Sequence, residues 1–458
     1  MQKKGFRIGL VTFVLLLLAS LAFGAEGAAE PPITHAYITI GVLIGAAILF
    51  FTEIVPLPIT AMLVPVALSI FHIIPAKVAF SNFGNQWVVI FMAMFVVGEA
   101  TFVTGFADKV GKLTVKLSQG SETKLLLFSM IAIASLSSVL SNTGTTVVAI
   151  PMIMGMCATA GIRPSKILMP VAFAANLGGT ITLVGTPPNG LVNSIIGKMG
   201  GQEIAPFGFF EFAKFGIPLT IVGILYYALI GKNFLPDTQA ACDLEDENLE
   251  SKIPKVKRPE KMWVCLAIFA FVVAAMATDF IPLVTAAMLG ACLVVITGCM
   301  TMKEAFKSVD WTTIFLFAGT LALSTALEKS GAAKLIATTV VSQVSDPYVL
   351  MAVICVLTAI ITNFMSNTAT TALMAPLALP IATQSGVSPL PLLMGIAMSA
   401  SSCFLTPVAT PPNTIVLGPG NYKFIDYFKS GWPLQLISML MCIFLIPLIW
   451  PFQTAMYP

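Results

Sequence analysis

Two short polar motifs each occur twice in this chain, inside apolar stretches long enough to lie in a membrane. The first motif, Ser141-Asn142-Thr143, returns 225 positions later as Ser366-Asn367-Thr368. The second, Thr186-Pro187-Pro188-Asn189, returns 224 positions later as Thr410-Pro411-Pro412-Asn413. Hydroxyls, amides and helix-breaking prolines are costly inside a bilayer unless protein surrounds them or they line a cavity. The matched order and spacing therefore predict one site built from two related halves.

The composition is that of a membrane protein with many spans. Of the 458 residues, 57% are hydrophobic and only 10% are charged, whereas roughly a quarter of the residues in a soluble domain are charged. The net charge of +3, without a basic stripe, predicts no nucleic-acid partner. The eight cysteines lie mostly within apolar runs and lack a CxxC spacing, so we interpret them as small hydrophobic residues.

Apolar runs of about 17–25 residues have the length of a membrane-spanning helix. We expect such spans near residues 8–24, 37–55, 58–75, 86–105, 165–195, 213–231, 262–280, 282–299, 311–328, 390–415 and 431–450. Two further apolar stretches, 123–160 and 347–384, are each interrupted by a Ser-Asn-Thr motif. Each stretch is too long for one span and too interrupted for two. The predicted fold is therefore an all-α polytopic membrane protein with about 11 transmembrane helices and two re-entrant helical hairpins.

The lysines and arginines predict the orientation of these spans. With a cytoplasmic N-terminus and both hairpins re-entrant, 19 basic residues fall on the inside and five on the outside. Residues 1–36 would form an N-terminal helix and an outer loop. The alternative for this segment is a signal peptide that ends near Gly24-Ala25. The expected location is the cell's inner (plasma) membrane, crossed many times.

The repeat extends beyond the two motifs and divides the chain into halves. We expect a first repeat at 37–235, a polar cytoplasmic linker at 236–260 and a second repeat at 261–458. Each repeat contains an odd number of spans, so the second would insert upside down relative to the first. The hairpins at 123–160 and 347–384 and the broken helices at 165–195 and 390–415 would then meet near the bilayer midplane.

The motifs have the chemistry of an ion site. A Ser-Asn-Thr triplet at the start of a helix combines side-chain oxygens with unpaired backbone N–H groups, which suit a carboxylate. Hydroxyl, amide and unwound carbonyl oxygens opposite it suit a small cation such as Na⁺. No charged residue occurs from Val349 to Tyr422, so co-bound cations would have to balance an anion held there. A single such motif could serve packing alone, but two copies with partnered broken helices favour a site.

With these paired motifs, the chain resembles the divalent anion:sodium symporter family, the dicarboxylate, citrate and sulfate carriers. The resemblance runs from about residue 37 to the end of the sequence. It implies an inverted-repeat homodimer in membrane lipid, with a scaffold domain and a transport domain that moves as an elevator. Spans 8–105 and 262–328 would be scaffold, whereas the hairpins and spans 165–231 and 390–450 would move.

The resemblance also implies residue roles, carried over by motif. Substrate contacts would come from Ser141, Asn142, Thr143, Thr186, Pro187, Ser366, Asn367, Thr368, Thr410 and Pro411. One Na⁺ would be bound by Ser137, Ser141, Asn142 and the backbone around Gly185, and a second by Thr362, Asn367 and the backbones of Met365 and Ala409. Ser137 and Thr362 each precede their triplet by four residues, about one helical turn. Some relatives have Ser in place of Thr186, so the added methyl group narrows the expected pocket.

The leading hypothesis is Na⁺-coupled uptake of a C4-dicarboxylate such as succinate, malate or fumarate, with no organic cofactor. Sulfate or citrate symport, and exchange of one dicarboxylate for another, are alternatives that are also consistent with these motifs. A membrane enzyme is disfavoured because no acid, base, thiolate or metal cluster lies at bilayer depth in the expected spans. A receptor is disfavoured because no soluble sensing segment exceeds the short linker.

Overall fold

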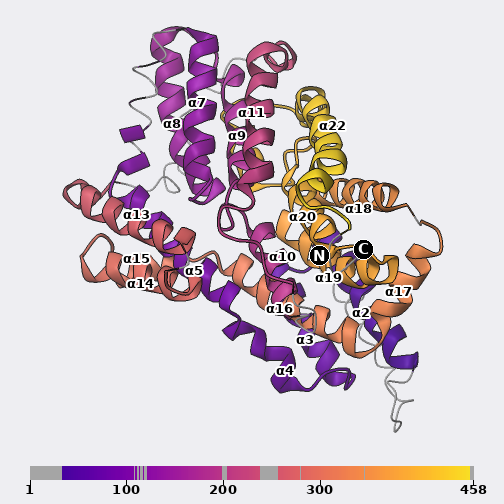
Figure 1. The fold of residues 1–458 in the computed structure, drawn as a ribbon. Coiled ribbons are helices and arrows are strands. Elements are labelled where there is room, and N and C mark those ends of the chain that lie inside the picture. The colour runs from indigo at the N-terminus through magenta and orange to yellow at the C-terminus, as the bar shows by residue number, and fades with distance from the viewer. Residues whose placement is uncertain are drawn as a thin grey trace, which may run out of the picture.

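A computed structural model describes residues 33–107, 109–110, 113, 117, 121–198, 204–237, 256–278, 280–344 and 346–453. The regular elements among these residues are all helical (Figure 1). The expected helix at 8–24 and most of the linker at 236–260 lie outside the described residues.

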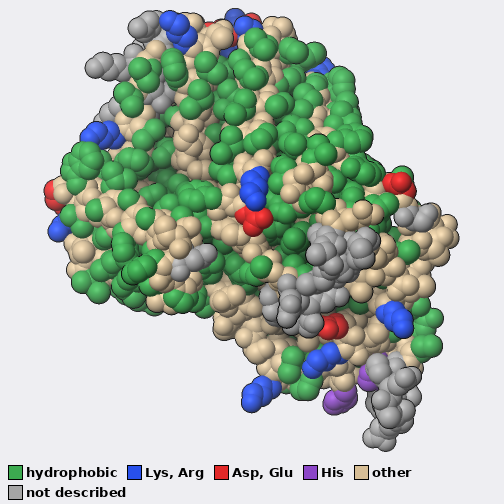
Figure 2. Space-filling model, in the orientation of Figure 1, with side chains coloured by type: hydrophobic (Ala, Val, Ile, Leu, Met, Phe, Trp, Pro, Cys, Tyr) green, Lys and Arg blue, Asp and Glu red, His purple; other side chains and the backbone are tan. Residues whose placement is uncertain are grey.

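Five helical segments are long and apolar enough to cross a membrane, counted over the described residues alone. They are Ile33–Thr52, Ala76–Val103, Pro259–Thr278, Trp311–Lys329 and Phe424–Ile449. Hydrophobic side chains cover most of the face seen in Figure 2, and lysines and arginines gather mainly at its edges. Such a surface suits contact with lipid rather than with water.

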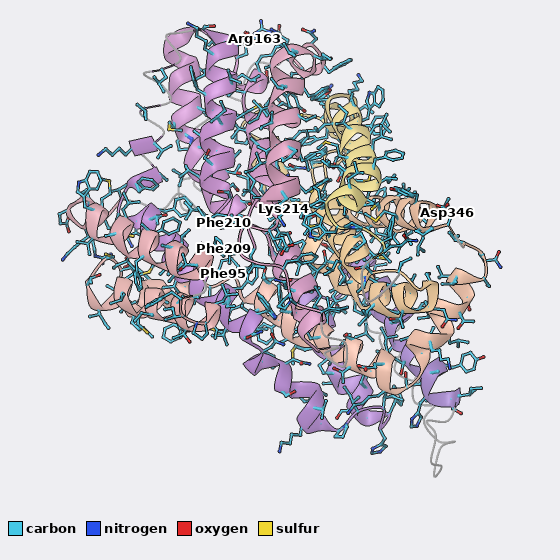
Figure 3. All side chains as sticks on the ribbon, in the orientation of Figure 1. Phe95, Arg163, Phe209, Phe210, Lys214 and Asp346 are labelled. Atoms are coloured by element: carbon cyan, nitrogen blue, oxygen red, sulfur yellow. The ribbon has the colours of Figure 1, made fainter. Side chains whose placement is uncertain are left out.

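Each interrupted apolar stretch folds as two helices joined by a turn at the motif. In the first stretch, α7 (Glu122–Ser137) is followed by α8 (Asn142–Ala160). In the second, α18 (Pro347–Thr362) is followed by α19 (Asn367–Ser385). Asp346, labelled in Figure 3, starts α18 by accepting hydrogen bonds from the backbone N–H groups of Tyr348 and Val349.

The segments expected to be broken helices are both interrupted. In the first half, α9 (Leu168–Gly179) is separated from α10 (Pro187–Lys198) by a non-helical stretch. In the second half, α20 (Pro389–Ser401) is separated from α21 (Pro411–Leu417). Both second helices begin at the first proline of a Thr-Pro-Pro-Asn motif, because proline fits the first helical turn, where its missing N–H costs no hydrogen bond.

The elements follow the same order in both halves. In the first half, α2 (Ile33–Thr52), α3 (Leu57–Ile70), α4 (Ala76–Phe80) and α5 (Gln86–Val103) precede the hairpin, and α11 (Ala213–Leu229) follows the broken helix. The second half has α13 (Met262–Thr278), α14 (Leu283–Ile296), α15 (Met302–Ser308) and α16 (Trp311–Lys329), and ends with α22 (Phe424–Ile449). The sequence did not predict α17 (Ala332–Val341), a short helix between α16 and the second hairpin.

The two halves interlock rather than pack as separate bodies. Helix α16 of the second half packs on α3 of the first, and α5 of the first half packs on α14 of the second. At the centre of Figure 1, α10 of the first half packs on α19 and α20 of the second. In turn, α21 of the second half packs on α8 and α9 of the first. Helices α7, α8, α9 and α11 form a group that projects away from this centre, and Arg163 lies at its far end (Figure 3).

Candidate substrate and cation site

One cavity of about 320 Å³ is lined by residues of both hairpin turns and of both helix breaks. Every residue expected to contact substrate lines it: Ser141, Asn142, Thr143, Thr186, Pro187, Ser366, Asn367, Thr368, Thr410 and Pro411. Its volume lies at the small end of the range for ligand pockets, about 300–1,000 Å³. The structure therefore brings together motifs that lie more than two hundred residues apart in the sequence.

The hairpin turns have the same local geometry in both halves. Ser141 and Ser366 are the N-cap residues of α8 and α19, and each hydroxyl accepts a hydrogen bond from a backbone N–H three residues on. The last residue of the preceding helix then reaches across each turn. Ser137 Oγ lies 2.6 Å from Asn142 Oδ1, and Thr362 Oγ1 lies 2.9 Å from Asn367 Oδ1.

The helix breaks are held open by matching asparagines. The side-chain amide of Asn189 donates to the backbone oxygens of Gly179 and Thr182, at 3.4 and 2.8 Å. That of Asn413 donates to Cys403 and Thr406, at 2.9 and 3.0 Å. These contacts satisfy carbonyls that a continuous helix would have bonded internally.

The first expected cation set forms a compact oxygen cluster. One atom of the Asn142 amide lies 2.6 Å from Ser137 Oγ and 3.2 Å from the backbone oxygens of Ala175 and Gly185. With the amide nitrogen there, Asn142 donates to all three oxygens. With the amide oxygen there, it lies within 3.2 Å of three other oxygens, and oxygens are the ligands that a small hard cation takes. Ser137, Asn142 and Gly185 were predicted, whereas the Ala175 carbonyl was not.

The second expected set is arranged similarly around Thr362. Its hydroxyl lies 2.9 Å from Asn367 Oδ1 and 2.6 Å from the backbone oxygen of Ala400. Ala400 follows Ala175 by 225 positions, so both halves present a carbonyl at the same place. Ala409 lines the cavity, and the side chain of Met365 is buried in the neighbouring core.

Asn176 is a site residue that the sequence analysis missed. It lies on α9, is buried and lines the cavity. Its amide nitrogen donates to Asn413 Oδ1 at 3.1 Å, and its amide oxygen accepts from Thr410 Oγ1 at 3.3 Å. It thus ties the first half to the second. Its repeat counterpart is Ser401, so no repeated motif signalled its role.

The rest of the cavity lining comes from α3, α5 and α16, together with residues beside the motifs. The apolar residues from the three helices are Leu57, Phe91, Met94, Phe95 and Leu316, and Phe95 is labelled in Figure 3. The polar ones are Asp310, Thr312 and Thr313, where α16 begins. Among the described residues that line this cavity, Asp310 is the only one with an ionisable side chain.

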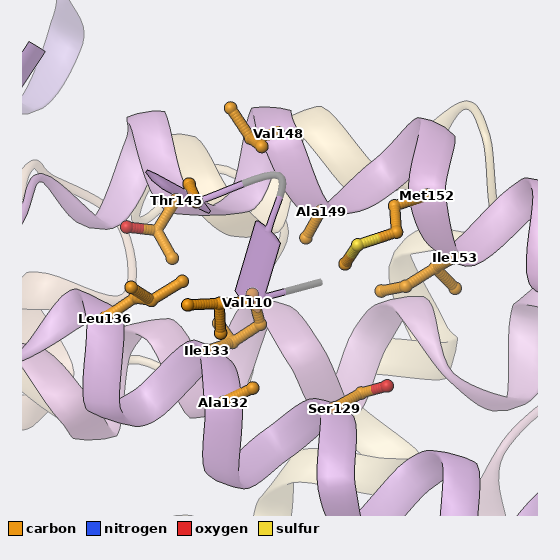
Figure 4. A pocket seen from close by; sticks show the side chains of 11 residues that line it. Val110, Ser129, Ala132, Ile133, Leu136, Thr145, Val148, Ala149, Met152 and Ile153 are labelled. Carbon is orange, nitrogen blue, oxygen red and sulfur yellow. The ribbon is translucent and has the colours of Figure 1, made fainter. Parts of the chain in front are cut away.

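A second, much smaller cavity lies inside the first hairpin (Figure 4). Side chains of α7 and α8 face one another across it, among them Ile133, Leu136 and Met152. Its two hydroxyls, on Ser129 and Thr145, are buried without a hydrogen-bond partner among the described residues. Its mostly apolar lining suits packing within the hairpin rather than an ion site.

A model of the citrate transporter family (CitMHS) matches residues 47–383 and 345–457. The chain belongs to this family. Membership confirms the resemblance to the dicarboxylate, citrate and sulfate carriers that the paired motifs indicated. Together with the apolar helices, it makes the chain a multi-pass membrane protein.

Curated relatives of this family member are transporters. It is 28% identical over 501 residues to the sodium-dependent dicarboxylate transporter SdcS of Staphylococcus aureus (strain USA300), covering 98% of this chain and 93% of that protein. It is 26% identical over 603 residues to the uncharacterized transporter YfbS of Escherichia coli (strain K12), covering 89% of this chain and 98% of that protein. These relatives point to a transporter and not to an enzyme.

Solved transporters share the fold at low identity. The Alcanivorax borkumensis YdaH transporter aligns over 100% of both chains with a TM-score of 0.62 and 15% identity. Neisseria gonorrhoeae MtrF aligns over 95% of this chain and 97% of its own, with a TM-score of 0.60 and 13% identity. At such identities the likeness concerns the fold alone.

Proposed function

We propose that this protein is a secondary active transporter that couples Na⁺ entry to uptake of a C4-dicarboxylate of the succinate, malate and fumarate class. The observation that carries the proposal is the shared cavity, whose hydroxyl and amide side chains come from both hairpin turns and both helix breaks. The name of the relative SdcS, a sodium-dependent dicarboxylate transporter, supports both the ion and the substrate class.

Coupling to Na⁺ follows from the charges of the cavity. The described residues that line it include no lysine, arginine or histidine, so none of them supplies a positive charge to neutralise a bound dicarboxylate. Burying an unpaired charge costs from about 2.5 to more than 10 kcal/mol. Cations bound beside Ser137 and Asn142, and beside Thr362 and Asn367, would remove that cost. Anion binding would then require Na⁺.

The architecture that best fits this function is an inverted repeat with an elevator movement. The repeats would be 37–235 and 261–458, joined by the linker 236–260, and the matching hydrogen bonds of the two halves support this division. The scaffold would comprise 8–105 and 262–328, and the hairpins with 165–231 and 390–450 would move past it. The scaffold would also supply a homodimer contact, within the inner membrane and with a cytoplasmic N-terminus.

Citrate is the second candidate substrate. The family is described as citrate transporters, and citrate would use the same hydroxyl and amide donors. Sulfate symport and dicarboxylate exchange follow from the same site chemistry.

The proposal is tested by uptake into proteoliposomes that contain the purified protein. Labelled succinate, citrate and sulfate are offered with an inward Na⁺ gradient and, as the control, with choline replacing Na⁺. We expect succinate uptake that needs Na⁺ and is abolished in both Asn142→Ala and Asn367→Ala. Equal uptake in choline medium would reject Na⁺ coupling, and uptake of citrate alone would favour the second candidate.

The movement is tested at the contact between α5 and α8. A Cβ atom added at Gly144 would lie 2.7 Å from the ring of Phe102, so the proposed scaffold touches the proposed moving part there. A short cleavable cross-linker between Phe102→Cys and Gly144→Cys should stop uptake, and cleaving the linker should restore it. The single cysteine variants treated alike are the controls. Normal uptake with the cross-link complete would reject the elevator.

A further inference from the structure

Asp310 is a negative charge in a cavity for which we propose an anionic substrate. It is exposed and lines the cavity with Thr312 and Thr313, and no other residue of the lining that the structure describes carries a charge. Its carboxylate is held in place, because Oδ1 accepts from the Thr312 N–H at 3.0 Å and Oδ2 accepts from Thr313 Oγ1 at 2.5 Å. The charge therefore has a fixed position relative to the site.

The repeat indicates that this charge is not needed for folding. Asn85 precedes Asp310 by 225 positions and caps α5 as Asp310 caps α16. Its side chain accepts a hydrogen bond from the Trp87 N–H at 2.9 Å, and it does not line the cavity. Asparagine and aspartate are about equally good N-cap residues, so a neutral residue would start α16 as well.

We propose that Asp310 is a specificity-determining residue that limits the charge of the transported anion and favours dianions over trianions. This inference rests on the proposed function of the cavity. Two like charges about 8 Å apart, at an effective dielectric constant of about 30, lower a binding constant roughly tenfold. That separation does not exceed the Debye length at physiological salt, about 8 Å, so screening is incomplete. Each further negative charge on the substrate would incur this penalty again.

The test compares two anions of similar chemistry, succinate and propane-1,2,3-tricarboxylate, at one pH at which both are fully ionised. The measured quantity is the ratio of kcat/KM for the trianion to kcat/KM for the dianion, in proteoliposomes with an inward Na⁺ gradient. We expect Asp310→Asn to raise this ratio about tenfold. The matched control, Asn85→Asp, places the same charge on the equivalent cap outside the cavity and should leave the ratio unchanged.

Other results would overturn the inference. An unchanged ratio in a transporting Asp310→Asn variant rejects it, and so does a weaker apparent Na⁺ affinity without a changed ratio, which would make Asp310 a cation ligand. If Asp310→Asn does not reach the membrane, Asp310→Ser, which keeps an N-cap hydroxyl, is measured instead with the same expected rise. Failure of the wild type to transport either anion would reject the proposed function itself, and the inference with it.

Discussion

The two units that meet at the cavity, α7 to α10 and α18 to α21, make nearly the same polar contacts with different residues. Ser137 is replaced by Thr362, Gly179 by Cys403 and Gly185 by Ala409. Three contacts recur in both units. A hydroxyl at the end of the first hairpin helix contacts the asparagine of the Ser-Asn-Thr triplet, and the asparagine of the Thr-Pro-Pro-Asn motif donates to carbonyls of the helix break. A threonine hydroxyl in the helix break donates to a backbone oxygen just after the first hairpin helix. What the repeat has kept is therefore the pattern of polar contacts rather than the side-chain volume around them.

The differences show which unit is packed more tightly. A Cβ atom at Gly185 would lie 2.5 Å from the backbone oxygen of Gly179 and 2.8 Å from that of Ser138. The equivalent position of the second unit already holds a side chain, that of Ala409. Asn176 of the first unit also forms hydrogen bonds with Asn413 and Thr410 of the second unit. Its counterpart Ser401 bonds within its own helix. The two units therefore share the same polar contacts, but only the second has room for a side chain at this position of the helix break.

The sharpest way to break this comparison is to exchange the small residues at the two helix breaks. Gly185→Ala should reduce Na⁺-dependent uptake by about a hundredfold, because the added methyl group clashes with the backbone oxygens of Gly179 and Ser138 and so shifts the carbonyl of Gly185, which belongs to the first cation set. Ala409→Gly should keep most uptake and cost about 0.5–1 kcal/mol of stability through backbone entropy. Uptake is measured at equal protein per liposome. Similar losses in both variants would contradict the difference in packing.

The hydrogen bonds of Asn176 to the second unit should give the next largest effect. Asn176→Ala should lower uptake roughly tenfold, because Asn413 and Thr410 lose a buried hydrogen-bond partner, at about 1–3 kcal/mol. Ser401→Ala is the matched control from the other half, since the Ser401 hydroxyl donates to the backbone oxygen of Ala397 in its own helix, at 2.8 Å. Its uptake should stay within about twofold of wild type. The idea fails if the Ser401 variant is the weaker of the two.

The hydroxyls at the ends of α7 and α18 should have a smaller effect, seen in Na⁺ dependence. Ser137→Ala and Thr362→Ala should each raise the Na⁺ concentration for half-maximal uptake about fivefold, the equivalent of about 1 kcal/mol for one lost ligand. Thr362→Ser, which keeps the hydroxyl, should behave nearly as wild type. An unchanged Na⁺ dependence in both alanine variants would exclude these hydroxyls as ligands.

The smallest effect should come from the short connectors before the third spans. In the second half, Glu304 on α15 pairs with Lys257 at 2.6 Å and Arg258 at 2.9 Å. The hydrogen bond from Lys257 is the largest cause of the lowering of the pKa of Glu304 from 4.5 to about 2. In the first half, α4 has Val78 at the equivalent position. The second connector alone should therefore show acid-sensitive stability.

Because the folded-state pKa of Glu304 is lowered, its stabilising effect is present above pH 4.5 and lost between about 4.5 and 2. Glu304→Gln should melt slightly below the wild type in detergent at neutral pH. The difference should shrink as the pH falls through that window. A difference that grows on acidification would contradict this sign.

The sequence predicted the features that depend on motif and span length. The turns at the two Ser-Asn-Thr motifs and the openings before Pro187 and Pro411 follow from capping residues and from proline chemistry. The ten residues expected to contact substrate could be named because each lies within a repeated motif. Their placement in one cavity agrees with the expectation of a shared site.

The remainder depends on packing that has no local signal. Asn176 and the carbonyl of Ala175 lie in an ordinary apolar helix, and only the approach of α21 and the hairpin turn gives them partners. Asp310 looks like a simple helix cap in the sequence, and its place at the cavity results from how α16 packs against α3, α10 and α19. Helix α17 was missed because it is a short helix in a stretch read as a connection.

The central claim is that the two halves build a single site, and substrate protection of one cysteine from each half tests it most directly. Thr143→Cys and Thr368→Cys are made separately in a background without the native cysteines, and the rate of thiol labelling is followed at rising succinate concentration in Na⁺ medium. We predict that succinate slows labelling of both cysteines with the same half-maximal concentration, and does so at neither position when choline replaces Na⁺. Protection of only one cysteine, or clearly different half-maximal concentrations at the two, would contradict a shared site.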